Sequence, residues 1–464
     1  MSLERDVSAA ARRICEADRV TVISHIDADG ITSLSILMQA ITRAGIEASP
    51  VFVRQLEPLM MHHIPQDDSL KVFADLGAGQ QNLLEDHGLA EDRVVIIDHH
   101  VSQDVETPYM QVNALPYGHT KFSAAGAAYL VARAIDGDNR DLAKLAVVGN
   151  VGDMMAREDC GLIGPARTIA DDGIEYGNVE AKRDLNCYGI STRPLNLCLA
   201  YNDDPFIEGI TNNPAGARML LASLGIPERT REGRWRVWED LADAEKQAVC
   251  SALAEQIVAH DGDTGRLCAE VYLFPDEARG TALRNASEFS TLLNACGRWA
   301  RPAVGSAICA GDRAEALREA GQMLARHRAT IRELLTYILT TGVQELDAIQ
   351  YLHVGDRFPD TVVGIGAGMA LSKLGRNKPI LIMCSLPDDP ALTKVSMRAD
   401  DRMVSAGIDL QAALIEAAGP FGGAAGGHAI AAGAYIPKTA EQEFVHRVNQ
   451  CIKKQCGAAG QGDC

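Results

Sequence analysis

Short apolar segments alternate with helical ones over residues 19–150, and this alternation restricts the fold more than any other feature of the chain. Strands that alternate with helices form a mostly parallel sheet wrapped on both faces, so the predicted fold class is α/β. Ligands of such a sheet gather at the carboxyl ends of its strands. The strands are expected at 19–25, 50–54, 70–75, 93–98 and 110–113, and the helices at 30–45, 80–88, 122–136 and 140–149.

Two strings of acidic and histidine side chains come directly after two of these strands. They are His25-Ile26-Asp27-Ala28-Asp29-Gly30 and Asp98-His99-His100. Groups of this kind repel or desolvate one another at a strand end unless a positive charge lies between them. Carboxylate oxygens mixed with imidazole suit Mn²⁺, Mg²⁺ or Zn²⁺ better than an ion that prefers thiolates. The two strings therefore predict metal-assisted hydrolysis.

Two more carboxylates complete the set, one at the end of the strand over 70–75 and one after a helix. Two divalent cations would neutralise four carboxylates, while two neutral imidazoles also bind. A metal pair about 3.5–4 Å apart holds a phosphate on both sides and lowers the pKa of a bridging water. The bridging ligand is expected to be a carboxylate, because it has two oxygens. The carboxylates are Asp27, Asp29, Asp75 and Asp153, and the imidazoles are His25 and His99.

A single Asp after a strand is usually a helix cap or a loop residue, and a single His is usually structural. The combination of both strings behind two buried strands is a much rarer coincidence. We therefore favour a metal site over a purely structural role for the set.

Composition limits the class of protein. The chain has 464 residues, enough for two or three domains, and 47% of them are hydrophobic. No apolar run is long enough to cross a bilayer, and the amino-terminal segment lacks the pattern of a secretory signal. We expect a cytoplasmic protein without membrane contacts whose 12 Cys are reduced, since no CxxC pair occurs. The net charge of −18 predicts low nonspecific affinity for nucleic acid and a strong dependence on divalent ions.

Three segments are expected along the chain, over 1–200, 201–345 and 346–464. The first is the parallel-sheet domain, continued by helices over 150–200. The second is predicted to be a largely helical connecting or inserted segment that ends in a long helix over 312–340. The third is predicted to be a smaller α/β domain. Its strands are expected at 361–365, 379–384 and 393–397, and its closing helix near 440–455.

Two glycine-rich tracts occur in the third segment. The tract over 364–369 has Met where a dinucleotide loop has its last glycine, so we interpret it as a turn from a strand into a helix. The tract from Phe421 to Gly433 lets backbone N–H groups approach an anion closely, and His428 can donate to a phosphate oxygen. A tight turn packed on a sheet is the other interpretation of this second tract.

The acidic and histidine residues resemble the DHH phosphoesterase superfamily, which includes RecJ exonucleases, nano-RNases, cyclic-dinucleotide phosphodiesterases and family II inorganic pyrophosphatases. The resemblance covers four motifs, at His25–Gly30, Asp75, Asp98–His100 and Gly152–Asp153. It implies a two-metal phosphoesterase on a parallel-sheet DHH domain. The implied cofactors are two divalent cations, Mn²⁺ in preference to Mg²⁺.

The resemblance also implies a role for each side chain. Asp75 would bridge the two cations. His100 would face the scissile phosphate or the leaving group, and Asp98 would orient a metal ligand without binding the cation itself. The remaining ligands would be His25 and Asp27 for the first cation, and Asp29, His99 and Asp153 for the second.

The carboxyl-terminal tract is similar to the GGGHxxAAG signature of the DHHA1 domain, although Ala424 and Ala425 interrupt its glycine run. The similarity implies that Gly426, Gly427 and His428 bind substrate phosphate. Upstream, residues 394–398 resemble the DHHA1 strand whose arginine holds phosphate, which gives Arg398 that role. A DHHA1 domain follows the DHH domain in the nuclease branch, whereas pyrophosphatases carry a different second domain.

Residues 284–289 and 292–298 resemble stretches of archaeal RecJ-like proteins, with Arg284 and Arg298 as further substrate-contact candidates. This implies a replication or repair exonuclease that hydrolyses single-stranded DNA or RNA to nucleoside monophosphates. Some members of that group associate with the GINS replication complex, so a replisome partner is a further implication.

Two alternatives stay open. A nano-RNase or cyclic-dinucleotide phosphodiesterase would take a short oligonucleotide with the same two lobes, but such enzymes usually lack a large middle segment. A replisome scaffold without activity would have lost metal ligands, whereas all the expected ligands are present here.

Overall fold

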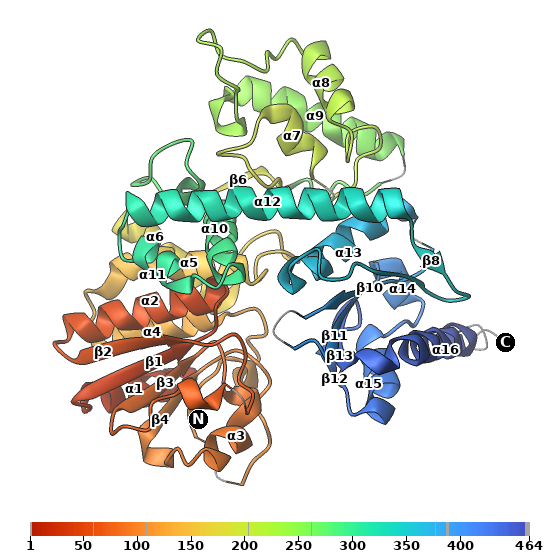
Figure 1. Cartoon of the computed structure of the whole chain (residues 1–464). Helices are drawn as coiled ribbons and strands as arrows, with labels where there is room; N and C mark the ends of the chain where they lie inside the picture. The colour runs from red at the N-terminus through yellow and green to blue at the C-terminus, as the bar shows by residue number, and fades with distance from the viewer. Residues whose placement is uncertain are drawn as a thin grey trace. The chain divides into compact units, whose positions relative to one another are not determined.

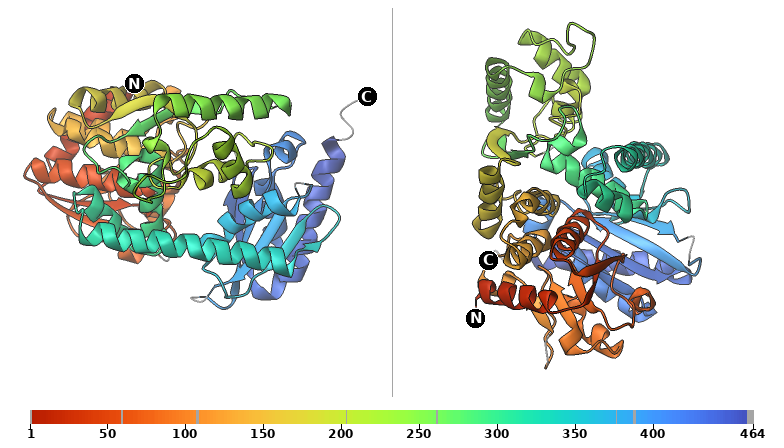
Figure 2. Two further views of the ribbon diagram at one scale, coloured as in Figure 1. Left: turned by 90° about the horizontal axis from the view of Figure 1, so that it is seen from above. Right: turned by 90° about the vertical axis from the view of Figure 1, so that its left-hand side faces the viewer.

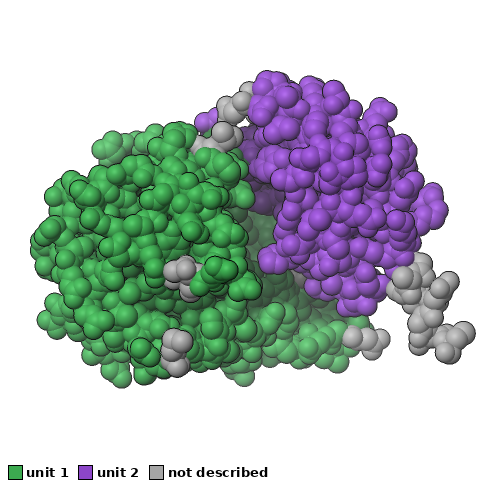
Figure 3. Space-filling view, turned by 90° about the horizontal axis from the view of Figure 1, so that it is seen from below, with its two compact units in different colours: residues 1–324 green, residues 325–464 purple. Residues whose placement is uncertain are grey.

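The computed structural model describes residues 2–58, 60–106, 109–202, 204–260, 262–375, 377–386 and 389–459. Its internal contacts divide the chain into two compact units, Met1–Leu324 and Ala325–Cys464 (Figure 3). Each unit has its own main sheet and its own buried core. Among the described helices, none has the length and the apolar character needed to cross a membrane. The division into segments 1–200, 201–345 and 346–464 stays a prediction.

Unit 1 contains a five-stranded sheet in which all neighbouring strands are parallel, in the order β2-β1-β3-β4-β5 (Figure 1). All five predicted strands exist, each within three residues of its expected bounds, and the α/β fold class is confirmed. The strands are β1 (Arg19–Ser24), β2 (Glu47–Phe52), β3 (Leu70–Ala74), β4 (Val94–Ile97) and β5 (Met110–Val112).

Both faces of this sheet are buried, because side chains alternate between the faces along each strand. Val22, Val72 and their neighbours on one face pack in a core with α2 (Ala28–Arg43), α4 (Ala124–Ile135) and α5 (Ala143–Gly152). On the opposite face, Ile23 and Phe73 belong to a second cluster that includes Leu84 of α3 (Gln81–Asp86). This two-sided burial explains why the strands are continuous apolar runs.

The rest of unit 1 is mainly helical, and α7, α8 and α9 form a separate group away from the sheet (Figures 1 and 2). This group has its own hydrophobic core, which includes Trp238. Strands β6 and β7 form an antiparallel pair. β6 lies in the region over 150–200 that was predicted to be helical, and β7 lies in the region over 201–345 that was predicted to be largely helical. The elements are α1 (Leu3–Cys15), α6 (Gly164–Tyr176), β6 (Glu180–Leu185), α7 (Leu195–Ala200), α8 (Pro214–Ser223), α9 (Asp243–Ala259), β7 (Cys268–Leu273), α10 (Ala286–Arg298) and α11 (Pro302–Cys309).

Unit 2 is built on a mixed six-stranded sheet in the order β12-β13-β11-β10-β9-β8. Its strands are β8 (Gln344–Glu345), β9 (Gln350–His353), β10 (Ile380–Ser385), β11 (Leu392–Arg398), β12 (Ala424–Gly427) and β13 (Ala431–Pro437). The long helix α12 (Glu315–Thr341) leads into it, as predicted for 312–340. The other helices are α13 (Asp360–Leu374), α14 (Asp401–Ser405), α15 (Leu410–Ala418) and α16 (Glu441–Ala459).

The prediction of a strand over 361–365 and a turn over 364–369 was wrong, because both lie inside α13. The β-branched residues before Gly364 are typical of a strand, and the glycines are typical of a turn. The glycines serve close packing instead. A Cβ added at Gly366 would lie 2.4 Å from Leu334 Cδ2, and one added at Gly364 would lie 2.5 Å from Arg398 Nη2.

Two glycine substitutions in α13 test this packing. Gly366→Ala should lower the free energy of unfolding of unit 2 by about 1–3 kcal/mol, because the added methyl group overpacks a buried leucine. Gly368→Ala is the matched control, since its nearest neighbour would be Arg398 Cγ at 3.9 Å. It should raise stability by about 0.5–1 kcal/mol, because alanine loses less backbone entropy in a helix. Denaturant unfolding measures both; an equal effect of the two changes would contradict the packing role of Gly366.

Candidate metal centre

The candidate ligands lie at the carboxyl edge of three neighbouring strands. His25 follows β1, Asp75 follows β3 and Asp98 follows β4, and these strands are adjacent in the order β1-β3-β4. Asp27 caps α2 by accepting a hydrogen bond from Gly30 N at 2.9 Å. A Cβ at Gly30 would lie 2.3 Å from His25 O, so the loop needs glycine there. The strand-to-helix turn thus folds the first motif tightly back on itself.

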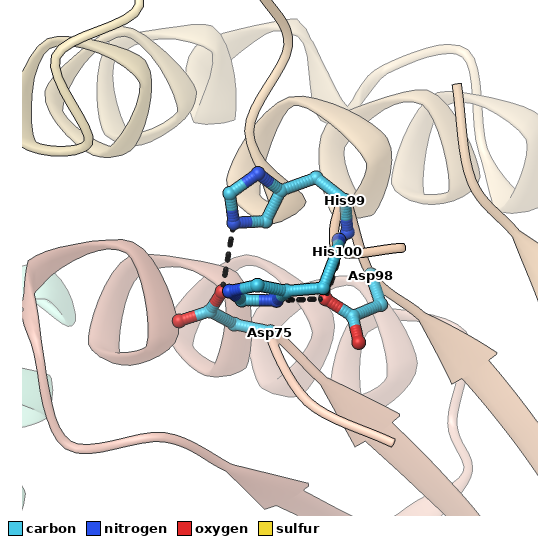
Figure 4. Close-up of side chains that lie close together, drawn as sticks. All are labelled: Asp75, Asp98, His99 and His100. Atoms are coloured by element: carbon cyan, nitrogen blue, oxygen red, sulfur yellow. Dashed lines mark hydrogen bonds and ion pairs between the residues drawn. The ribbon is translucent and has the colours of Figure 1, made fainter. Parts of the chain in front are cut away.

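Asp75 lies between two groups of potential ligands. Its Oδ2 is 3.4 Å from His25 Nδ1, which is also 3.1 Å from Asp27 Oδ2. Its Oδ1 is 3.3 Å from His99 Nε2, as Figure 4 shows. His99 Nε2 is in turn 3.4 Å from Asp153 Oδ2 and 3.9 Å from Asp29 Oδ2. The structure therefore brings together all six residues predicted as metal ligands, in two sets that meet at Asp75.

The backbone around these carboxylates is unusual. Asp75 is buried and has a φ of 62°, in the left-handed region that non-glycine residues rarely adopt. Met154, directly after Asp153, has a φ of 64°. Aspartate tolerates this region better than most residues. Such conformations collect at functional sites, where the surrounding fold enforces them.

Asp98 accepts three hydrogen bonds from backbone N–H groups. Oδ2 accepts from Ala78 N at 3.0 Å, and Oδ1 accepts from His99 N at 2.8 Å and His100 N at 3.2 Å. Oδ1 also lies 2.7 Å from His100 Nδ1 (Figure 4). Asp98 is buried and lies in one group with Asp75, His99 and His100 that could hold a cation, so its orienting role stays a prediction. The His100 side chain is 60% exposed, and its Nδ1 is the atom that lies against Asp98.

Crowding changes the protonation of these groups. Burial raises the pKa of Asp75 well above its usual range, and the charges of Asp27 and Asp29 raise it further. Burial, followed by the charge of Asp29, raises the pKa of Asp153 to about 7. Burial alone would lower the pKa of His25, but hydrogen bonds to Asp27 and Asp75 outweigh it and raise the pKa to about 11. The cluster therefore draws protons into itself when it lacks cations, and cation binding would displace them.

Asp29 also has a structural partner. Its Oδ2 accepts a hydrogen bond from Ala124 N at 2.9 Å and its Oδ1 from Ala125 N at 3.0 Å, both in the first turn of α4. A helix amino terminus stabilises a carboxylate there. Gly149 of α5 makes room for it, since a Cβ at that position would lie 2.6 Å from Asp29 Oδ1. Each oxygen keeps lone pairs for a cation, so the helix cap and the ligand role are compatible.

Helix α10 packs directly on the first motif, and this contact was not predicted from the sequence. Asn294 Oδ1 accepts a hydrogen bond from Ala28 N at 2.9 Å. A Cβ at Gly297 would lie only 1.8 Å from Ile26 O, so the helix and the loop touch backbone to backbone. In the stretch over 292–298, only Arg298 was predicted to have a functional role.

The two arginines of this region behave differently from simple surface cations. Arg284 is buried, donates to Phe274 O at 2.7 Å and lies 3.6 Å from Glu239, which indicates a structural role. Burial lowers the pKa of Arg298, while the charge of Asp27 acts in the opposite direction. Arg298 is therefore electrostatically coupled to the first ligand set.

Unit 2 places Arg398 beside the glycine tract. The tract is a β-hairpin of β12 and β13, not an open loop: His428 N donates to Ala431 O at 2.8 Å, and Ala431 N donates to His428 O at 3.2 Å. Arg398 pairs with Ala431 across β11 and β13, so it lies at the same end of the sheet as the hairpin tip. Gly427 has a φ of 131°, and a Cβ there would lie 2.5 Å from Ala431 O. His428 is exposed and Gly426 is half-buried.

Three family models match the chain. The DHH family, N-terminal domain, matches residues 19–150, the DHH-CID domain matches 187–267, and the DHHA1 domain matches 347–454. An uncharacterized protein of Methanocaldococcus jannaschii is 27% identical over 447 residues, which are 94% of each chain.

Solved structures share the fold. RecJ of Thermus thermophilus in complex with Mn²⁺ has a TM-score of 0.60 at 17% identity, over 97% of this chain and 55% of that one. The chain thus spans about half the length of that RecJ. CDC45 of Entamoeba histolytica has a TM-score of 0.65 at 14% identity, over 97% and 99% of the two chains. The chain thus carries the DHH, DHH-CID and DHHA1 domains of the DHH superfamily, and it shares its fold with the solved RecJ and CDC45 structures.

Proposed function

We propose that the protein is a two-metal phosphodiesterase that removes nucleoside monophosphates from an end of single-stranded DNA or RNA. The observation that carries the proposal is the position of Asp75, with one oxygen toward His25 and the other toward His99. A carboxylate in that position can bridge two cations, and two cations can hold one phosphate. Membership of the DHH superfamily supports the hydrolase class.

The donor set fits two hard divalent cations. Carboxylate and imidazole ligands suit Mn²⁺ and tolerate Mg²⁺. The solved RecJ structures include complexes with Mn²⁺ and with Mg²⁺. We propose His25, Asp27 and Asp75 for one cation, and Asp75 with Asp29, His99 and Asp153 for the other. When bound, the cations supply Lewis acidity and an activated water.

The remaining groups bind and orient the substrate. Asp98 holds His100 through Nδ1, so that its Nε2 can donate to the phosphate or to the leaving oxygen. Arg398 supplies a permanent positive charge for a phosphate, and the peptide groups of Gly426 and Gly427 with the His428 ring supply further donors. Since the net charge is −18, these local donors and the cations must together attract the polyanion.

The size of the substrate and the partner of the protein are further parts of this proposal. A short oligonucleotide or a cyclic dinucleotide is the alternative substrate. A GINS or other replisome association stays a prediction; the likeness to CDC45 concerns the fold.

An end-labelled digestion tests the activity. Single-stranded DNA and RNA of about 20 nucleotides, and a dinucleotide, are incubated with Mn²⁺, Mg²⁺ or EDTA. We expect mononucleotide release from the long strands with Mn²⁺, and none with EDTA. Asp75→Ala should reduce release to background with the fold retained. Asp68→Ala is the control: it removes an exposed acid just before β3, at the opposite end of that strand from Asp75, and should retain activity. Full activity of Asp75→Ala would contradict the bridging role, and cleavage of the dinucleotide alone would favour the alternative substrate.

A second prediction concerns α10. Asn294→Ala removes the acceptor for Ala28 N and loosens the loop that carries Asp27 and Asp29, so the affinity for Mn²⁺ should fall by about 10–100-fold, as for other groups that orient metal ligands. Activity should return at high Mn²⁺ concentration. Thr291→Ala is the control, because its hydroxyl donates to Ser287 O within the same helix. Mn²⁺ titration by calorimetry measures the affinity; unchanged binding in Asn294→Ala would rule out the positioning role.

A further inference from the structure

Two thiols in the DHH-CID region lie unusually close together. Cys187 follows β6, and Cys198 lies in α7. Their Sγ atoms are 2.9 Å apart, and Cys187 Sγ also lies 2.7 Å from Cys198 O. A disulfide has a sulfur–sulfur distance of about 2.05 Å. The two sulfurs are therefore only about 1 Å farther apart than in a disulfide.

The chain between the two cysteines is folded so that it holds them together. Gly189 has a φ of 92°, and Arg193 N donates to Gly189 O at 2.8 Å, which closes a turn. Cys198 N then donates to Pro194 O at 2.8 Å in the first turn of α7. This turn and the first turn of α7 thus bring the two thiols into contact in the reduced protein.

The two thiols differ in accessibility. Cys187 is half-buried, whereas Cys198 is buried. The hydrogen bond with Cys187, followed by burial, raises the pKa of Cys198 well above its usual range, while the charge of Arg193 acts in the opposite direction. An oxidant from solvent therefore meets Cys187 first, and Cys198 is placed to resolve the product.

We propose that Cys187 and Cys198 are a reversible oxidation site, in which a low-molecular-weight disulfide such as glutathione disulfide converts the two thiols into a disulfide. The Cys187 thiol loses its proton and attacks the oxidant, which releases one small thiol and leaves a mixed disulfide. Cys198 Sγ then attacks Cys187 Sγ, gives up its proton and releases the second small thiol. Two protein thiols are oxidised and one small disulfide is reduced to two thiols.

The loop enclosed by this bond is attached to α10. Ser191 N donates to Glu288 Oε1 at 2.8 Å, and the Thr192 hydroxyl donates to the other Glu288 oxygen. Glu288 is fully buried. The disulfide would therefore restrain a loop that anchors the same helix that packs on the first metal motif, and the proposal does not depend on the nuclease activity.

Thiol mapping on the full chain tests the proposal. The reduced protein is equilibrated with glutathione buffers of increasing oxidised fraction, alkylated, digested and analysed by mass spectrometry. We expect a linked Cys187–Cys198 peptide pair that disappears when the buffer is made reducing again. Hydrogen exchange should show slower exchange of the amides between the two cysteines in the oxidised protein.

Three variants make the result specific. Cys198→Ser should trap Cys187 as a mixed disulfide with glutathione, and Cys187→Ser should leave Cys198 unmodified in the folded chain. Cys456→Ser removes an exposed thiol in α16 and should leave the linked pair intact. Free Cys187 and Cys198 in the wild type at every buffer ratio would overturn the proposal. So would modification of Cys198 before Cys187.

Discussion

Repulsion between buried carboxylates at one edge of a sheet is the constraint on which this structure depends. Asp29 and Asp75 are buried, and burial followed by the charge of Asp27 raises the pKa of each. Burial and the charges of Asp29, Asp75 and Asp27 likewise raise the pKa of Asp153. In a low-dielectric site such charges cannot all ionise without a positive partner. His25 and His99 alternate with the acids, so protons or cations can bind between them. The fold keeps these groups together against their own repulsion, and this indicates function more than stability.

The surrounding fold supplies what this arrangement needs. Parallel strands bring three loops to one edge, and glycine at Gly30 and Gly149 lets the chain approach closely. The amino terminus of α4 stabilises Asp29, and the hydrogen bonds of Asp98 fix the second histidine string. Helix α10 closes over the first motif from a position more than 250 residues later in the chain. The site therefore depends on helices outside the DHH motifs, α4 and α10 among them, and not on the motifs alone.

The strands and the acids that follow them could be predicted from the sequence, because they depend on local patterns. The runs around Val22, Val72 and Val95 have the continuous apolar character of parallel strands, and the acids that follow them meet at one edge because parallel strands end together. Where helix and strand patterns compete, the prediction failed. Thr361, Val362 and Val363 are β-branched and precede Gly364, yet they are helical, and the glycines of this helix pack closely against Leu334 and Arg398.

Long-range contacts explain the remaining gaps. Neither the pairing of β6 with β7 nor the contact of Asn294 with Ala28 leaves a local signal, since each joins segments far apart in the sequence. The glycine tract was predicted as a phosphate-binding candidate, but its place in the sheet comes from the pairing of β13 with β11, which local sequence patterns do not specify.

Anomalous diffraction from crystals of the full chain with Mn²⁺ tests the central claim most directly. We predict two manganese peaks about 3.5–4 Å apart, with Asp75 contacting both. The first should also contact His25 and Asp27, and the second His99 and Asp153. A single peak, or two peaks of which only one contacts Asp75, would contradict the claim that paired cations hold these carboxylates together.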